Sequence, residues 1–481
     1  MKNISSKKIA KNYIYNSLYQ VLILITPLIT TPYVSRVLGV TGIGVYNYTR
    51  SIATYFVLVG AVGTTLYGQR EIAYVQNEPS KYSKLFWEIT LFRFVMVSIC
   101  TVIYLVCFGR NTEYGIIYQA LALEVFATAF DISWFFMGME NFRLTVIRNT
   151  IIKLIGTALV FIFVKSSDDV LVYTLCLTVP IFVGNVSLWF SLPKYLVKTR
   201  IEIRDIFRRI GPIIILFLPQ IATEVYTVLD KTMLGQLATN IDEVGFYTQS
   251  EKIVKLVLSI LTSLGTVMLP AMSFAFAQGR FKEIVYSIQK AFNFVFLLGF
   301  ALLFGLDAVA TNFVPFFFGQ GYEPVINLIR VISPIFILIG MSNVIGRQYL
   351  LPTQRQTLFT VSVVLGSVVN VILNFLLIGK YNAIGASVAT VIAEFSVTAI
   401  QCWFVRKQLP LKNIFLSAIK YLVLGAIMGV AVYYVGKVLE TGVLGLLIQI
   451  IAGIIIYLGG LLITKDKLLL EGIEILIKRV K

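Results

Sequence analysis

The sequence predicts an all-α polytopic membrane protein with about 14 transmembrane helices, arranged as two pseudo-symmetric six-helix lobes plus two extra C-terminal helices. Three observations lead to this fold class: the composition, the apolar segments and the distribution of basic residues. The 481 residues are 58% hydrophobic and 14% charged, and the mean hydropathy is +0.85. A soluble core does not need so much apolar sequence, so the chain is expected to lie in a membrane.

A spanning helix needs about 20 mostly apolar residues. The segments that meet this requirement are 14–38, 45–67, 85–107, 114–137, 149–165, 169–192, 210–236, 246–274, 290–314, 322–348, 356–378, 382–405, 413–436 and 443–464. The apolar stretch near the N-terminus continues to Leu38, and no small-residue cleavage site follows it. We therefore interpret it as the first transmembrane helix, not as a signal peptide.

Basic residues alternate between the connections. The termini and the even-numbered connections hold most of the lysines and arginines, whereas the odd-numbered connections hold only Arg110, Lys165, Lys380 and Lys437. The positive-inside rule then places both termini on the cytoplasmic side of the cytoplasmic (inner) membrane. Topology thus explains most of the net charge of +17, and no nucleic-acid partner is expected.

The chain repeats itself in part, because residues 44–52 (GVYNYTRSI) resemble residues 245–253 (GFYTQSEKI). The two copies are six helices apart, so both lobes run in the same direction. The predicted divisions are an N-lobe at 1–192, a basic cytoplasmic linker at 193–209, a C-lobe at 210–405, and two helices with a basic tail at 406–481. We expect the linker to form an amphipathic helix on the inner leaflet.

Several kinds of chemistry are absent from the sequence. It has no histidine, so imidazole metal sites and histidine-based triads are excluded. Its four cysteines lie in apolar runs without metal-like spacing, and no phosphate loop of the Walker type occurs. We expect a protein that is not an enzyme, with no metal site, no catalytic residues and no cofactor except for H⁺ or Na⁺ as a coupling ion.

Charges inside the predicted spans are the candidates for function, because such residues usually face a bundle interior or an aqueous cavity. The candidates for binding an anionic substrate are Arg36, Arg50, Lys231, Lys252 and Lys255. The candidates for ion coupling or ion pairing are Asp230, Glu251, Glu224, Glu124 and Asp131.

Spacing adds detail to these candidates. The repeat makes Arg50 equivalent to Glu251, so we expect the two to face each other across the lobe interface. Glu251 and Lys255 form an i,i+4 pair in the favourable order. Glu224 shares a helix face with Lys231, and Glu124 shares one with Asp131. In the structural alternatives, the basic residues snorkel at membrane boundaries and the acidic residues form local ion pairs.

The stretches PLITTPYVSRVLGVTGIGVYNYTRSI (27–52) and LDKTMLGQLATNIDEVGFYTQSEKIVKL (229–256) resemble the polysaccharide transporter family. These are Wzx-type flippases of the multidrug/oligosaccharidyl-lipid/polysaccharide exporter superfamily. The resemblance covers essentially the whole chain. It implies alternating access through a cationic central cavity and an undecaprenyl-pyrophosphate-linked oligosaccharide as substrate. It also implies that an external polymerase and its chain-length machinery act after transport.

Three other functions remain open at this point. A lipid II flippase for peptidoglycan would use similar physics, and a multidrug antiporter of the same superfamily would need an acidic or aromatic cavity. The first two predicted spans contribute arginines and no acid, which disfavours the antiporter. A membrane polymerase or ligase would usually have a large outer loop, and the outer connections here are short.

Overall fold

The computed structural model describes residues 6–110, 113–439 and 442–480, with the side chains of these residues except 6–18, 215–216, 218–227, 263–267, 270, 472 and 475–480. Within the described ranges every regular element is helical and no strand occurs, so the all-α prediction is confirmed. The chain forms two compact units, Met1–Gly235 and Gln236–Lys481.

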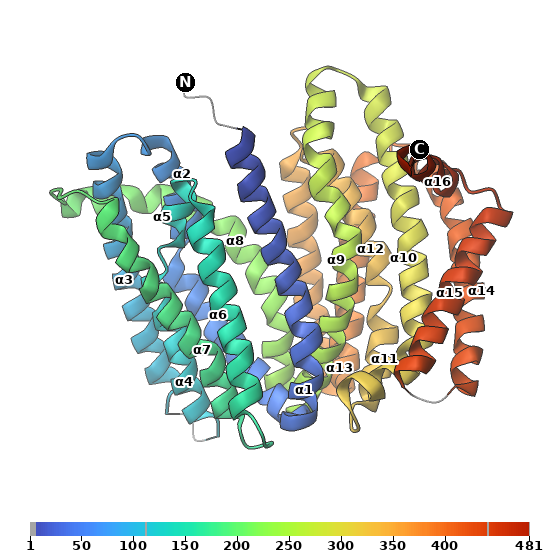
Figure 1. Cartoon of the computed structure of the whole chain (residues 1–481), viewed down its shortest axis with the longest axis horizontal. Helices are drawn as coiled ribbons and strands as arrows, with labels where there is room; N and C mark the ends of the chain where they lie inside the picture. Colours follow the sequence, from blue (N-terminus) through green and yellow to red (C-terminus); the bar gives the residue numbers. More distant parts are fainter. Residues whose placement is uncertain (1–5, 111–112, 440–441, 481) are drawn as a thin grey trace. The chain divides into compact units, whose positions relative to one another are not determined.

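Unit 1 contains long helices joined by short connections (Figure 1). Its elements are α1 (Ser6–Ala61), α2 (Thr64–Val75), α3 (Pro79–Cys107), α4 (Gly115–Ala127), the 3₁₀ turn η1 (Thr128–Phe130), α5 (Ser133–Gly138), α6 (Phe142–Phe163), α7 (Val170–Ser187), the 3₁₀ segment η2 (Leu188–Lys194) and α8 (Ile203–Leu237).

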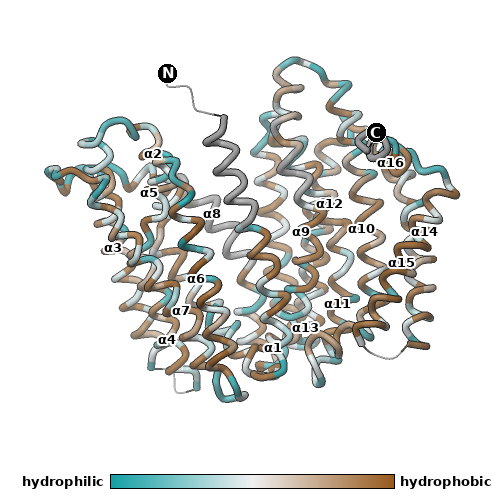
Figure 2. Tube along the Cα trace, in the orientation of Figure 1, coloured by the Kyte–Doolittle hydropathy of each residue, from teal (hydrophilic) through white to brown (hydrophobic). Residues whose placement is uncertain are grey.

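Unit 2 also consists of long helices joined by short connections. Its elements are α9 (Asp242–Ala277), α10 (Phe281–Phe318), α11 (Glu323–Ile332), α12 (Ile335–Asn343), the π-helical segment η3 (Val344–Leu350), α13 (Gln356–Val405), α14 (Leu411–Val438), α15 (Val443–Ile463) and α16 (Lys467–Val480). Figure 2 shows that α10, α14 and α15 are hydrophobic along most of their length, with hydrophilic residues gathered at the connections.

Ten helical stretches of described residues are long and apolar enough to cross a membrane. Two of them, Tyr19–Val75 and Gln356–Val405, have 57 and 50 residues, so each is long enough to cross twice. The predicted segments 210–236 and 246–274 fall on α8 and α9, which are not among the ten. The structure therefore supports a protein that crosses the membrane many times, and the count of about 14 stays a prediction.

Single residues with positive φ divide the two longest helices. Gly39 breaks α1 at φ 67° and ψ −176°, and Asn382 breaks α13 at φ 52° and ψ −132°. Gly39 lies in the connection predicted between the first two spans, and Asn382 is the first residue of the span predicted at 382–405. The connection that the sequence predicts at 39–44 is thus one non-helical residue, Gly39, because glycine adopts positive φ at little steric cost.

Aromatic side chains form the core of unit 1 between α3, α5 and η2. Phe86 and Trp134 are fully buried and stack with their ring centroids 5.6 Å apart. Gly68 of α2 brings its helix against this core, since a Cβ at Gly68 would lie 2.3 Å from the Trp134 ring. In unit 2, Gly425 similarly lets α14 approach α10, where an added Cβ would lie 2.9 Å from Phe304.

The linker at 193–209 differs from its prediction. Residues 196–202 are not helical, and the helix resumes only at Ile203 as the start of α8. The expectation of an amphipathic helix across the linker is therefore wrong for this stretch. Alternating residues from Val197 to Ile203 are β-branched, and this pattern favours an extended backbone over a helix. The Val197 amide donates to Ser83 Oγ at 3.0 Å, which ties the segment to α3.

The described side chains near the start of α8 contact other helices of unit 1. Arg209 Nε donates to the buried carboxylate of Glu88 on α3 at 2.5 Å, and Lys84 pairs with Asp205 at 2.6 Å. Farther along, a Cβ at Gly63 would lie 3.0 Å from Phe217 of α8. The contacts thus divide the chain at Gly235. The predicted lobe boundary at the linker describes the sequence repeat and stays a prediction.

Candidate functional site

Arg50 extends from α1 to α4 and forms a two-pronged ion pair with Glu124. Its Nη2 donates to Glu124 Oε1 at 3.0 Å, and its Nε donates to Oε2 at 3.3 Å. The Arg50 side chain is nevertheless 45% exposed, whereas that of Glu124 is 16% exposed. Because a guanidinium has five N–H donors, Arg50 keeps donors for a second oxyanion after it has paired with Glu124.

Aromatic residues and a second cation surround this pair. The Arg50 guanidinium carbon lies 5.9 Å from the Tyr46 ring centroid, and the Tyr46 and Tyr173 rings meet edge to face at 4.8 Å. Lys153 of α6 is half-buried and lies within electrostatic range of Arg50. We call these five residues, Arg50, Glu124, Lys153, Tyr46 and Tyr173, the Arg50 cluster. With two cations and one anion, the cluster has a net positive charge inside a predicted membrane span.

The break at Gly39 changes the depth of Arg50. A second span that begins at residue 45, as the sequence predicts, would put Arg50 a few residues from a membrane boundary. The helix instead resumes directly after Gly39, so Arg50 lies 11 residues, about 16 Å, along it. This is roughly half of a hydrocarbon thickness of about 30 Å. Snorkelling to an outer boundary is therefore a poorer explanation for Arg50 than the sequence suggested.

The polar face of α8 lies against α1 next to this cluster. Thr232 Oγ1 is 2.8 Å from Ser51 Oγ and 3.2 Å from the Tyr55 hydroxyl. Asp230 is buried and lies within electrostatic range of Tyr55, while Lys231 is half-buried. Unit 1 thus brings two of the predicted charge-bearing spans together.

Glu124 and Asp131 do not share a helix face, so that prediction is wrong. Helix α4 ends at Ala127, η1 follows, and Asp131 has an extended backbone with φ −74° and ψ 101°. Its Oδ1 accepts a hydrogen bond from the Ser133 amide at 3.0 Å at the start of α5. This local side-chain to backbone bond competes with continuation of the helix.

Asp131 belongs instead to a structural network. It lies 3.6 Å from Arg93 and 3.7 Å from Arg148, and Arg148 donates to Asn185 at 2.5 Å. The buried Arg93 also donates to the Thr128 carbonyl at 2.8 Å. These bonds join α3, η1, α6 and α7, so we assign Asp131 to packing within unit 1.

Unit 2 contains the remaining candidates. Lys255 Nζ lies 2.6 Å from Glu251, as the i,i+4 spacing predicts, and Lys252 is half-buried beside them. Glu224 lies in α8, but its side chain is outside the described residues. Arg36 is exposed on α1, three residues before the break. The expectation that Arg50 and Glu251 face each other involves both units and stays a prediction.

Lys153 was not selected as a candidate from the sequence, although it is one of the basic residues within the spans. The internal repeat points to other helices, because the span that carries Lys153 contains no repeat motif. Lys153 could have been found from its position, because a lysine near the middle of an apolar helix is itself a sign of a functional site. As for metals, no group of three or more cysteine, aspartate and glutamate side chains comes together within the described ranges.

Comparison with known proteins supports the resemblance to the polysaccharide transporter family. The family model "Polysaccharide biosynthesis protein" matches residues 9–276, and the family model "Lipid II flippase MurJ" matches residues 148–453. A putative O-antigen transporter of Escherichia coli K12 is 22% identical over 410 residues, which covers 84% of this chain and 98% of that protein.

Solved structures show the same fold. A lipid II flippase MurJ in an inward closed conformation superposes with a TM-score of 0.72 at 16% identity, covering 94% of this chain and 99% of that one. An inward-facing multidrug resistance MATE family transporter gives 0.57 at 12% identity, with 82% and 98% covered. Since the first family model alone matches more than half of the chain, the chain belongs to the polysaccharide biosynthesis protein family within the multidrug/oligosaccharidyl-lipid/polysaccharide exporter superfamily.

Proposed function

We propose that the protein is a flippase that moves undecaprenyl-pyrophosphate-linked oligosaccharide units from the inner to the outer leaflet of the cytoplasmic membrane. The units would then serve the synthesis of a capsule, an exopolysaccharide or an O-antigen-like polymer. The similarity to a putative O-antigen transporter, over 84% of this chain, supports this substrate class.

The observation that carries the proposal is the Arg50 cluster. A pyrophosphate is a compact anion whose transfer into hydrocarbon would cost tens of kcal/mol without compensation. A partly exposed guanidinium in a membrane span offers such compensation, because Arg can bind phosphate oxygens with two parallel bonds. An unexplained Arg at this depth would cost about 2.5–3.5 kcal/mol on insertion, so a function for it is expected.

Transport also requires release of the substrate. Glu124 competes with the pyrophosphate for Arg50, since both are oxyanions that bind the same donors. We propose that Arg50 exchanges Glu124 for substrate on binding and returns to Glu124 on release. Arg36, Lys231, Lys252 and Lys255 are proposed as further cations of an alternating-access pathway, and Asp230, Glu224 and Glu251 as ion-coupling or pairing residues for H⁺ or Na⁺.

A lipid II flippase is the second candidate, favoured by the match of its family model to residues 148–453. Both candidates move a polyprenyl pyrophosphate, so the charge pattern alone does not distinguish them. A multidrug antiporter fits less well, because residues 1–70 contain no acidic residue and the cluster is net positive. No catalytic residue, metal or nucleic-acid partner is proposed, and a polysaccharide polymerase is proposed to act next.

Deletion of the gene provides the test. We expect surface polysaccharide to be lost and its lipid-linked repeat unit to accumulate in the cytoplasmic leaflet, where mass spectrometry of extracted lipids identifies it. Accumulation of lipid II with arrested growth would support the second candidate. Normal surface polysaccharide with no accumulated intermediate would contradict both.

A further inference from the structure

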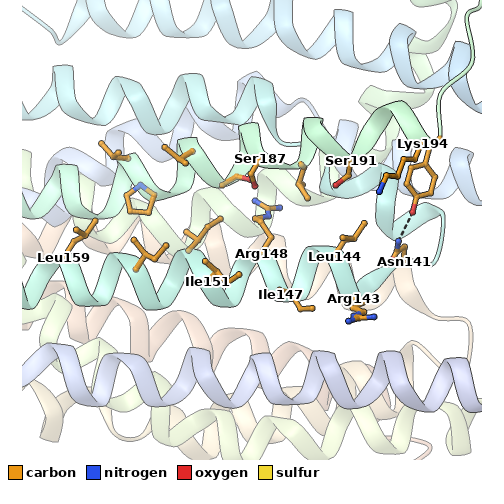
Figure 3. A pocket seen from close by; sticks show the side chains of 18 residues that line it. Asn141, Arg143, Leu144, Ile147, Arg148, Ile151, Leu159, Ser187, Ser191 and Lys194 are labelled. Atoms are coloured by element: carbon orange, nitrogen blue, oxygen red, sulfur yellow. Dashed lines mark hydrogen bonds between the residues drawn. The ribbon is translucent and has the colours of Figure 1, made fainter.

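A crevice on unit 1, lined by none of the Arg50 cluster residues, changes from cationic at one end to apolar at the other. It has a volume of about 880 Å³ and runs between α6 on one side and α7 with η2 on the other. In Figure 3, Asn141, Arg143 and Lys194 gather at one end, Leu159 lies at the opposite end, and Ile151 lies between them. One end of the crevice is therefore cationic and the other is apolar.

The lining residues carry one sign of charge. They include Arg143, Arg148 and Lys194 and no acidic residue, and most of the others are leucine, isoleucine or valine. Arg148 is already held by Asp131 and Asn185. Arg143 and Lys194, by contrast, are exposed and have no ion-pair partner among the residues described here. Two cations at the mouth thus remain available for an anion.

The apolar part of the crevice is about as long as the hydrocarbon layer of one leaflet is thick. From Ile147 to Leu159 the wall follows α6 for 12 residues, about 18 Å of helix. Half of a hydrocarbon core of about 30 Å is of similar length. Val179 and Val183 of α7 form the facing wall and are exposed, although both are apolar. A hydrocarbon chain would cover these side chains along the full length of the crevice.

The mouth lies on the side where anionic lipid is expected. Arg143 begins α6 and Lys194 ends η2, and both belong to connections that the positive-inside rule places in the cytoplasm. The cytoplasmic leaflet carries the anionic lipids that attract such residues.

From this charge complementarity and matching depth, we infer that the crevice binds one anionic phospholipid of the cytoplasmic leaflet. The headgroup phosphate binds Arg143 and Lys194, and one acyl chain lies against Ile151, Ile155 and Val183. This site goes beyond the proposed function, because the phospholipid stays in its leaflet and stabilises unit 1 without being transported.

Thermal unfolding of the purified full-length protein in dodecyl maltoside tests the site. We expect dioleoyl phosphatidylglycerol to raise the Tm in a saturable manner, and dioleoyl phosphatidylcholine or inorganic phosphate to leave it unchanged. The double variant Arg143→Gln/Lys194→Gln should need at least about tenfold more phosphatidylglycerol for half of the effect. Val183→Trp should weaken the effect similarly by filling the crevice, while every cation is kept.

The matched control is Lys407→Gln/Lys412→Gln, which removes two exposed cations from the connection before α14 and the first turn of α14, a region of unit 2 that is also predicted to be cytoplasmic. This variant should respond like the wild type. An equal loss of response in the control, or a normal response in Val183→Trp, would overturn the inference. Tighter binding of undecaprenyl phosphate than of phosphatidylglycerol would also overturn it, because the crevice would then belong to the substrate pathway. None of these outcomes depends on export activity.

Discussion

At the scale of single residues, Arg50 can have a structural role or a substrate-binding role, and the two roles require different properties of its side chain. As a structural residue, it needs only an oppositely charged partner on α4, and Glu124 supplies one. As a substrate-binding residue, it must itself be a cation, because the ligand is an anion. The 45% exposure of its side chain favours binding, while the geometry of the ion pair is consistent with both explanations.

A charge swap separates the two explanations. We expect Arg50→Ala to reduce polysaccharide export about 10- to 100-fold, since charge-assisted hydrogen bonds contribute about 1.5–3 kcal/mol each. Arg50→Lys should retain part of the activity as a point charge. The swap Arg50→Glu/Glu124→Arg should restore protein levels in the membrane without restoring export. Full export by the swapped variant would assign Arg50 a structural role only.

The residue scale also shows where sequence reasoning fails. The pairing of Glu251 with Lys255 follows from helical spacing, because both lie within one unbroken helix. The shared face of Glu124 and Asp131 was inferred from the same spacing, but the helix ends between them. A carboxylate that accepts a backbone N–H two residues ahead ends a helix locally. The spacing of hydrophobic residues in the sequence does not reveal such a hydrogen bond.

At the scale of elements, breaks in the helices define the arrangement of unit 1. Gly39 has φ 67°, and no atom lies within 4 Å of the position that its Cβ would take. Its importance is therefore conformational and does not come from packing. The sequence located this break to within a few residues, because the glycines marked a connection. It did not show that the connection is one residue long, which decides the depth of Arg50.

Replacing Gly39 with alanine should therefore destabilise the protein by about 1–2 kcal/mol, the cost of positive φ for a residue with a Cβ. The matched control is Gly459→Ala in the helical interior of α15, where an added Cβ also meets no atom within 4 Å. That change should be neutral or stabilise by up to about 1 kcal/mol. Thermal unfolding in detergent compares the two variants, and equal effects would refute the conformational explanation.

The C-terminal helix α16 is held by a buried carboxylate in the turn before it. Asp466 is 2% exposed, pairs with Lys420, and accepts hydrogen bonds from the Tyr421 hydroxyl at 2.9 Å and the Leu469 amide at 3.0 Å. Burial acts to raise the pKa of Asp466, but the bonds from Lys420, the Leu469 amide and Tyr421 outweigh burial, so its pKa lies below the usual value.

The sign of the pH dependence follows from this direction. Because the folded pKa is lower than the unfolded value of about 3.9, the ionised Asp466 stabilises the fold above that pH. Its contribution is lost as the pH falls through the folded pKa. We expect Asp466→Asn to lower stability by about 1–3 kcal/mol at pH 7. The difference from the wild type should shrink as the pH is lowered below about 4, and a constant difference in thermal unfolding would contradict this assignment.

At the scale of the whole molecule, composition and charge alternation were sufficient for the fold class, because the bilayer restricts a chain of this hydropathy to helices. The non-helical stretch 196–202 was missed because its β-branched alternation is short and lies beside basic residues, which suggested a surface helix. The packing of α8 with unit 1 depends on contacts such as Arg209–Glu88 between residues far apart in sequence. No local pattern predicts such contacts.

Topology can be measured directly on the whole chain. In a variant without the four native cysteines, Asp168→Cys should react with a membrane-impermeant maleimide in intact cells. Asn77→Cys should react only after the cells are permeabilised, because its connection is predicted to be cytoplasmic. Both positions are exposed, so differences in burial do not explain a difference in labelling. The reverse pattern would invert the proposed orientation.

The most direct test of the central claim is flipping by the purified protein in proteoliposomes. The substrate is an undecaprenyl-pyrophosphate-linked oligosaccharide placed in both leaflets, and the readout is the fraction cleaved by a glycosidase added outside. Without protein, about half of the substrate should be cleaved, whereas the wild type should expose nearly all of it and Arg50→Ala should not. Cleavage that stays at half with the wild type, or that rises equally with Arg50→Ala, would contradict the claim that a cationic site at Arg50 carries the pyrophosphate across the membrane.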